Sequence, residues 1–316
     1  MHILALTDNR AGHTSHTLGL AEALRLKTRG VVQQVPLAYG PLAKLPAPWV
    51  GAYAYDSISR ARLREGTPDL VVATGRRLRN ALLAIKRRHP SCQTVHCFGN
   101  PAPGITVSLR PDHDDTLIGD ISPLRFRGAL HRLSTASLEA ALPHFEQTYD
   151  TLPAPRIGVL LGGHSRRRQC QPSDIHHILD LAELLHGGKG SLIIAPSRRT
   201  PKHADRWAAE RITCPYAFWD GEGENPYLAM LAGCDALVVS GDSISMMSEA
   251  CFTGKPVFID TRFSTSTPKH RRVAAQLIAD GYAAPLTGDS LLDFHPTGRL
   301  DEMQRLMPEL CLALGL

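Results

Sequence analysis

The sequence lacks the signatures of a disulfide scaffold, a metal centre or a membrane span. Its seven cysteines include no CxxC pair, which favours reduced thiols inside a protein core. Its fifteen histidines form no HExxH motif and no three-ligand cluster, so we predict no metal. No apolar run approaches the roughly 20 residues that cross a bilayer, and the N-terminus enters a strand without a basic and apolar leader. These absences favour a cytoplasmic protein.

Aromatic residues and net charge are also scarce. Aromatics make up 6% of the chain and the formal net charge is only +5, with basic and acidic residues interspersed. Dedicated nucleic-acid binding is therefore not expected. The composition is otherwise that of an ordinary globular protein, and 316 residues are enough for two α/β domains of about 150 residues each.

Strand-like and helix-like segments alternate along both halves of the chain. Short apolar runs typical of buried parallel strands occur in the first half at His2–Leu6, Leu70–Thr74, Thr94–Phe98, Gly104–Leu109 and Thr116–Gly119, and in the second half at Ile157–Leu161, Ser191–Ala195, Leu237–Val239 and Val257–Ile259. Helical spacing follows at Ser134–Gln147, Ser173–His186, Lys202–Ile212, Tyr227–Gly233, Lys269–Asp280 and Asp301–Leu314.

A Pro-rich stretch between Tyr149 and Pro155 is suited to a linker. We therefore predict an α/β protein with two Rossmann-like domains, residues 1–150 and 151–316, facing across a cleft. In such sheets ligands bind at the C-terminal ends of the strands, so loops of both halves are expected to line that cleft.

The segment Ala236–Asp260 has the layout of a phosphate-binding strand, turn, helix, turn and strand. An apolar strand is followed by the small residues Gly241, Asp242 and Ser243, then by a helical run, and Gly254 lies where the helix should end. Backbone N–H groups at a helix N-terminus favour an anion, and the hydroxyls of Ser243 and Ser245 add donors. Glu249, about two turns along, is placed to accept bonds from a ribose. The same spacing also fits a plain N-cap and a solvated glutamate.

Two further loops of the second half should share that strand-end edge. One follows the strand Ile157–Leu161 and carries Gly162, Gly163 and Ser165, and the other follows Ser191–Ala195 and carries Ser197, Arg198 and Arg199. Arginine binds phosphate bidentately and stays charged, so the three loops together suit a nucleotide diphosphate.

These motifs resemble the donor-nucleotide site of GT-B fold glycosyltransferases. The resemblance rests on the Ser-rich turn at 243–245, Glu249 and the turn Gly254-Lys255-Pro256. It implies that the turn holds the diphosphate of a nucleotide sugar, UDP-sugar or similar, and that the glutamate holds its ribose. The C-terminal helix is expected to cross back to the first domain, as in other GT-B proteins.

A wider set of motifs resembles the elongated-mitochondria (mitochondrial fission Elm) family of plants and bacteria. The set comprises SRRTP at 197–201, GEGENPY at 221–227 with Asn225, GDSISMMSEACFTGKPV at 241–257, GRR at 75–77 and GHTSHTLGLAEAL at 12–24. The relation of this family to GT-B transferases implies a nucleotide-sugar site without specifying the reaction.

Transfer of a sugar with inversion needs a base near the acceptor hydroxyl. His13, on the loop after the first strand, is the first candidate, with Asp8 as its nearest acidic neighbour, and Asp114 is the second. Two alternatives stay open: His13 as a simple turn cap, and Asp114 as part of a polar loop before the strand Thr116–Gly119.

We therefore predict a metal-independent glycosyltransferase that takes no cofactor and passes a sugar to a cell-envelope glycan or lipid-linked acceptor. Peripheral contact with the inner membrane is a further expectation. Two alternatives remain. One is a nucleotide-sugar epimerase or hydrolase on the same scaffold, and the other is a non-catalytic adaptor at a membrane surface that uses basic patches such as Lys86-Arg87-Arg88.

Overall fold

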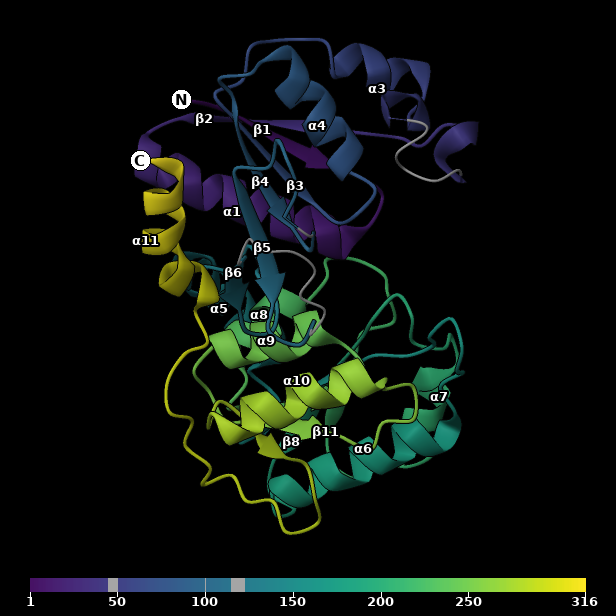
Figure 1. The fold of residues 1–316 in the computed structure, drawn as a ribbon. Coiled ribbons are helices and arrows are strands. Elements are labelled where there is room, and N and C mark those ends of the chain that lie inside the picture. The colour runs from purple at the N-terminus through teal and green to yellow at the C-terminus, as the bar shows by residue number, and fades with distance from the viewer. Residues whose placement is uncertain (45–50, 100, 115–122) are drawn as a thin grey trace. The chain divides into compact units, whose positions relative to one another are not determined.

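The chain folds into two α/β units, shown in a computed structural model (Figure 1). The structure describes residues 1–44, 51–99, 101–114 and 123–316, so the strand predicted at 116–119 lies outside the described residues. Unit 1 comprises Met1–Arg132 and Asp301–Leu316, and unit 2 comprises Leu133–Leu300.

Unit 1 is built on a parallel sheet with the strand order β2-β1-β3-β4-β5-β6. Its strands are β1 (His2–Thr7), β2 (Val31–Pro36), β3 (Leu70–Thr74), β4 (Gln93–Cys97), β5 (Val107–Pro111) and β6 (Leu124–Phe126). Its described helices are α1 (Ala11–Thr28), α3 (Ser57–Arg62), α4 (Arg79–Arg88) and α11 (Glu302–Leu314), with short 3-10 helices η1 (Pro41–Lys44) and η2 (Gly51–Ala54).

Unit 2 repeats this design with the order β12-β11-β10-β7-β8-β9. Its strands are β7 (Arg156–Leu161), β8 (Ser191–Pro196), β9 (Tyr216–Phe218), β10 (Ala236–Ser240), β11 (Val257–Asp260) and β12 (Ala284–Pro285). Its helices are α5 (Thr135–Tyr149), α6 (Pro172–Leu185), α7 (Ala204–Ala209), α8 (Tyr227–Gly233), α9 (Ile244–Phe252) and α10 (Pro268–Ala279).

Every residue of β10 is buried, as expected for a central parallel strand covered by helices on both faces. Leu237 and Val239 point to one apolar cluster, which includes α5, α8 and α9, while Ala236 and Val238 point to another, which includes α6. The sequence prediction of doubly wound α/β units is confirmed by this architecture.

The division between the units lies before α5 rather than at residue 150. The helix α5 packs against α8, and an added Cβ at Gly233 would lie 1.9 Å from the ring of Phe145. Phe145 and Leu138 belong to the same apolar cluster as Leu237 of β10. The Pro-rich stretch therefore marks only the loop between α5 and β7, because the apolar face of α5 is buried in unit 2.

The C-terminal helix returns to unit 1, as predicted. Leu306 and Leu310 of α11 are fully buried in the apolar cluster that includes α1, β4 and β5. The buried Glu302 accepts bonds from the backbone N–H of Arg127 at 2.9 Å and from its Nε at 3.2 Å. Apolar contact and a charged anchor together hold α11 on this unit.

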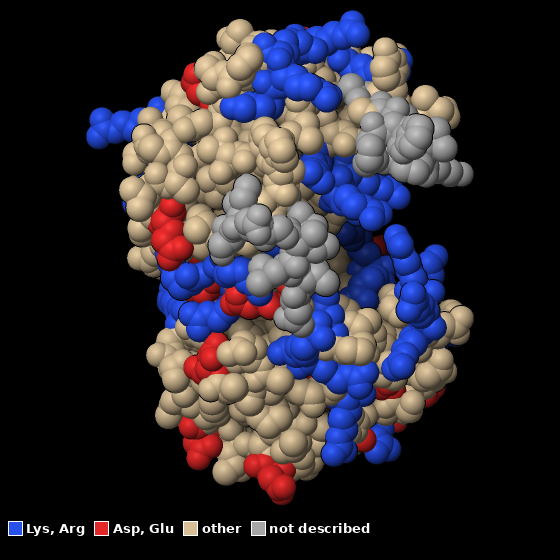
Figure 2. All heavy atoms as spheres, viewed as in Figure 1, with Lys and Arg blue, Asp and Glu red and all other residues tan. Residues whose placement is uncertain are grey.

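Lys and Arg side chains gather in several groups on the face of each unit seen in Figure 2. One group lies over the α3 and α4 region of unit 1, where Arg62, Arg64 and Arg87 are exposed. Among the described residues, no helix is both long enough and apolar enough to cross a membrane.

Candidate functional site

The three polar loops predicted to meet in unit 2 follow three neighbouring strands. Strand β7 pairs with β10 on one side and with β8 on the other, all in parallel. The loops that follow these strands begin at Gly162, Ser197 and Gly241 and therefore emerge along one edge of the sheet.

Asp242 is the centre of the hydrogen bonds that join these loops. Its side chain is fully buried, and its Oδ2 accepts from the Gly163 N–H at 3.1 Å, from Arg199 Nη1 at 2.8 Å and from Thr265 Oγ1 at 3.0 Å. Its Oδ1 accepts from Ser240 Oγ at 2.8 Å. Asp242 thus binds the loops to one another.

The glycines of this edge allow the loops to approach so closely. A Cβ added at Gly162 would lie 1.8 Å from Oδ1 of Asp242, and one at Gly163 would lie 2.0 Å from the backbone oxygen of Arg199. At Gly241 an added Cβ would lie 2.5 Å from the backbone oxygen of Asp260. Side chains at these positions are incompatible with the observed packing.

The two arginines of the β8 loop differ in what they contact. The guanidinium of Arg199 is paired with Asp242, and its Nη2 also donates to the Asp242 backbone oxygen at 3.4 Å. Arg198 is exposed, and no bond of its guanidinium is found among the described residues. Arg198 is therefore the more available phosphate donor.

The serines of the site mostly organise their own turns. Ser243 caps α9 by accepting from the Met246 N–H at 3.5 Å, and Ser245 lies half-buried in the first turn. Ser197 Oγ accepts from the Arg199 N–H at 3.3 Å, and Ser165 Oγ accepts from the Arg168 N–H at 3.0 Å. Ser243 thus has the simple N-cap geometry that the spacing also allowed, at a helix end that favours anions.

A fourth loop, 261–267 after β11, escaped the sequence analysis. Thr265 donates to Asp242, while Ser266 Oγ and Asp260 Oδ2 are buried and have no hydrogen-bond partner among the described residues. An added Cβ at Gly241 would lie 3.5 Å from Ser266 Oγ, so this hydroxyl borders the predicted turn. Unpaired buried oxygens are rare in proteins and point to a ligand or water. The run Ser264-Thr265-Ser266-Thr267 directly after a strand was the available signal.

Glu249 of α9 contacts the predicted motif at 221–227 through a hydrogen bond from Tyr227. Its Oε2 accepts from the Tyr227 hydroxyl at 2.5 Å, and the side chain of Asn225 accepts from the Tyr227 N–H at 2.9 Å. Burial raises the pKa of Glu249 to about 7, against the lowering effect of the Tyr227 bond. Asn225 also lines a hollow of about 310 Å³ between α5 and α8. Tyr227 is thus a site residue that the sequence analysis did not assign.

We expect this carboxyl to make the protein less stable as the pH rises. The pKa of Glu249 is about 7 in the folded chain and 4.5 unperturbed, so the folded state holds the proton to a higher pH. The contribution of the protonated carboxyl to the free energy of unfolding is complete below pH 4.5 and is lost as the pH passes 7. Glu249→Gln carries no charge and still accepts from Tyr227, so it should exceed the wild type in unfolding free energy by about 1–3 kcal/mol at pH 8.

Urea unfolding at pH 5 and pH 8 measures this gain, which should shrink toward pH 5. Glu222→Gln, on an exposed glutamate of unit 2, is the control and should show little change at either pH. An equal gain for Glu249→Gln at both values would contradict the raised pKa.

In unit 1, Asp8 lies on the loop after β1, whereas His13, predicted on that loop, belongs to α1. Asp8 accepts from the Tyr39 hydroxyl at 2.6 Å and from the Arg10 N–H at 3.0 Å, which shapes the turn before α1. No hydrogen bond joins Asp8 to His13 in the described part of the chain. His13 lies in the first turn of α1, against the backbone of Gly75, where an added Cβ would be 2.5 Å from its ring.

His13 is uncharged near neutral pH. Burial lowers its pKa below 6.5, and the opposing attraction of Asp8 is weaker. Close by, His16 stacks edge-on against Phe98 with ring centroids 4.7 Å apart, and burial lowers the pKa of His16 to about 3. A neutral imidazole at a strand end has the protonation state that a general base requires.

Asp114, the second predicted base, follows β5. Its backbone N–H donates to the Pro111 oxygen at 3.1 Å, and its backbone oxygen accepts from Arg110 Nη2 at 3.4 Å. Its neighbour His113 contributes to the electrostatic lowering of the His16 pKa, so the loop after β5 approaches α1.

Among solved structures, the fold is similar to a UDP-GlcNAc 2-epimerase and to MurG. UDP-GlcNAc 2-epimerase from Neisseria meningitidis, in a structure bound to UDP-GlcNAc, matches 99% of this chain and 100% of its own with a TM-score of 0.57 and 12% identity. MurG from Acinetobacter baumannii matches 99% of this chain and 92% of its own with a TM-score of 0.50 and 12% identity. These likenesses show a GT-B-like fold.

Two curated proteins are similar in sequence. "Mitochondrial fission protein ELM1" from Arabidopsis thaliana is 36% identical over 141 residues, which cover 42% of this chain and only 31% of that protein. An uncharacterized protein, RP120, from Rickettsia prowazekii is 24% identical over 321 aligned positions and 88% of each chain. The sequence profile "Mitochondrial fission ELM1" matches residues 11–311, and the chain belongs to this family.

Proposed function

We propose that this protein binds a nucleotide-diphosphate sugar at the strand ends of unit 2 and transfers the sugar to a cell-envelope glycan or lipid-linked acceptor. The observation that carries the proposal is the meeting of four polar loops at the N-terminus of α9, with Glu249 held by Tyr227 farther along that helix. Fold similarity to nucleotide-sugar enzymes supports the same substrate class.

The diphosphate is assigned to the N-terminus of α9. Its free N–H groups and helix dipole attract an anion, and the exposed Arg198 adds a charged donor. The Ser266 hydroxyl, which has no partner among the described residues, borders this position and can donate to phosphate. The ribose is assigned to Glu249, whose other carboxyl oxygen can accept from a sugar hydroxyl.

Transfer requires the acceptor oxygen to attack the anomeric carbon while the bond to the diphosphate breaks. The acceptor proton is assigned to His13, because a neutral imidazole can accept it. Arg198 and the α9 dipole would stabilise the charge that develops on the departing diphosphate, which makes a metal-independent transfer our proposal. Peripheral membrane contact stays a prediction from the sequence.

Thermal stabilisation by UDP, GDP, ADP, TDP and CMP tests the donor site. A ligand at a hundredfold excess over its dissociation constant should stabilise the protein by about 2.7 kcal/mol. Arg198→Ala should weaken binding about tenfold or more, because it removes a charge-assisted bond to phosphate. Glu249→Ala should also weaken a nucleotide, while Arg206→Ala, on an exposed arginine of α7, should leave binding unchanged.

Three other outcomes would redirect the proposal. If no nucleotide stabilises the protein, the nucleotide-sugar site is wrong and the non-catalytic adaptor takes its place. If stabilisation survives both Arg198→Ala and Glu249→Ala, the ligand binds elsewhere. If a nucleotide sugar is converted without any acceptor, the protein is an epimerase or hydrolase.

A further inference from the structure

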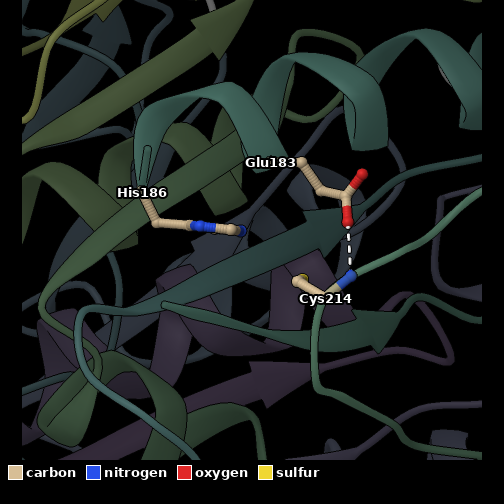
Figure 3. Close-up of side chains that lie close together, drawn as sticks. All are labelled: Glu183, His186 and Cys214. Carbon is tan, nitrogen blue, oxygen red and sulfur yellow. Dashed lines mark hydrogen bonds between the residues drawn. The ribbon is translucent and has the colours of Figure 1, made fainter. Parts of the chain in front are cut away.

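A second cluster of reactive side chains lies in unit 2, away from the proposed nucleotide site. Glu183 and His186 lie one helical turn apart at the end of α6, and Cys214 lies just before β9 (Figure 3). One potential ligand atom from each of the three lies within 4.8 Å of the others. These residues border the N-terminal ends of β8 and β9, whereas the nucleotide loops follow the C-terminal ends of the strands.

His186 is the second observation that points to a ligand. Its side chain is buried, with 6% of the residue exposed, and its Nε2 has no hydrogen-bond partner in the part of the chain that the structure describes. Figure 3 shows its ring extending toward the space beside Glu183 and Cys214. A buried ring nitrogen without a partner is costly unless something binds it.

Glu183 has one oxygen committed and one available. Its Oε1 accepts from the N–H groups of Thr213 at 2.7 Å and Cys214 at 2.8 Å, and from the Thr213 hydroxyl at 3.1 Å. These bonds hold the loop before β9 against α6. The Cys214 thiol also hydrogen-bonds to the Glu183 carboxylate, so these two proposed ligands already face each other. No other bond to Oε2 is found among the described residues.

We propose that Glu183, His186 and Cys214 bind a divalent transition metal of the zinc type. A set of one carboxylate oxygen, one imidazole nitrogen and one thiolate suits Zn²⁺, which accepts all three ligand types. Tetrahedral zinc with bond lengths of about 2.0–2.3 Å holds its ligand atoms roughly 3.5 Å apart, so these side chains need to close by only about 1 Å. Water would complete the coordination.

Binding requires two protons to move. Burial raises the pKa of the Cys214 thiol to about 12, so the metal must displace the thiol proton, which passes to solvent. Nδ1 of His186 accepts from the Gly190 N–H at 3.2 Å, which places the ring proton on Nε2 in the metal-free chain. Coordination through Nε2 transfers that proton to Nδ1 and breaks the Gly190 bond. The metal would then clamp the end of α6 to the start of β9.

Zinc titration of the full-length protein, stripped with a chelator and competed with a chromophoric zinc indicator, tests this site. We expect one equivalent of Zn²⁺ per chain. Cys214→Ala should bind at least tenfold more weakly, whereas Cys311→Ala, on a similarly half-buried cysteine of unit 1, should bind as the wild type does. Glu183→Gln keeps an oxygen for the loop N–H groups but is a poor ligand, so it should also bind at least tenfold more weakly.

Cobalt supplies a readout that a purely structural role would not affect. Co²⁺ bound by Cys214 should give a thiolate-to-metal absorption band that Cys214→Ala lacks and Cys311→Ala keeps. Far-UV circular dichroism identifies any variant that fails to fold, and the folded variants decide the result. Equal zinc affinity in the wild type and Cys214→Ala, or a cobalt complex without the thiolate band, would overturn the proposal. Neither result depends on nucleotide binding.

Discussion

Replacing Asp242 with alanine is expected to lower the free energy of unfolding by about 3–5 kcal/mol. The carboxylate is fully buried and accepts from a backbone N–H, a guanidinium and two hydroxyls, which lie on three other loops and at the end of β10. Its removal leaves the Gly163 N–H, the Arg199 guanidinium and the Thr265 hydroxyl without this partner inside the protein. Urea unfolding followed by tryptophan fluorescence measures the loss, since Trp207 and Trp219 both lie in unit 2.

Two other aspartate variants complete the Asp242 experiment. Asp242→Asn preserves the shape but removes the charge that pairs with Arg199, so its loss should be smaller than that of Asp242→Ala. Asp289→Ala, on an exposed aspartate of unit 2, should change stability by no more than about 0.5 kcal/mol. If Asp242→Ala were as stable as Asp289→Ala, the carboxylate would not hold the loops together.

Adding one methyl group at Gly163 should cost about 2–3 kcal/mol and abolish the proposed nucleotide stabilisation. The added Cβ of Gly163→Ala would lie 2.0 Å from the Arg199 backbone oxygen and 2.5 Å from the Thr200 nitrogen. Both contacts are with backbone, so no side-chain rotation relieves them. The β8 loop must shift, and it carries Arg198 with it.

Gly288→Ala is the matched control for this substitution. An added Cβ there meets nothing within 4 Å, so stability should change by less than about 1 kcal/mol and nucleotide binding should be unaffected. For Gly163→Ala, the prediction requires both a lower urea concentration at the unfolding midpoint and a smaller thermal stabilisation by the nucleotide. Wild-type values for Gly163→Ala would show that the β8 loop is free to move.

The strand-end edge of unit 2 illustrates how far the sequence alone could reach. Short apolar runs indicated parallel strands, and parallel strands end at one edge, so the convergence of the loops at 162, 197 and 241 followed from local patterns. The structure confirms that these loops meet, through the bonds of Asp242 to Gly163 and Arg199. The functional roles of these residues stay predictions.

The roles within the loops were not predictable in the same way. The sequence indicates only that Asp242 is a turn residue. In the structure its carboxylate is buried and pairs with Arg199, which was predicted to donate to phosphate. Glu249 pairs with Tyr227, twenty-two positions away in sequence, and the pairing depends on how α8 and α9 pack. The hydrophobic periodicity of a single helix does not predict which of its side chains will face a particular side chain of another helix.

The sequence by itself determined the alternation of strands and helices and the parallel sheets, because these follow from hydrophobic patterns within a dozen residues. The return of the last helix was expected only from the resemblance to GT-B proteins. Tertiary packing decided the rest. It assigned α5 to unit 2 through Phe145 against Gly233, and it brought Cys214 to the end of α6 beside Glu183 and His186. Such contacts join residues distant in sequence, and they depend on side-chain shape and burial that are defined only once the sheets and helices have packed.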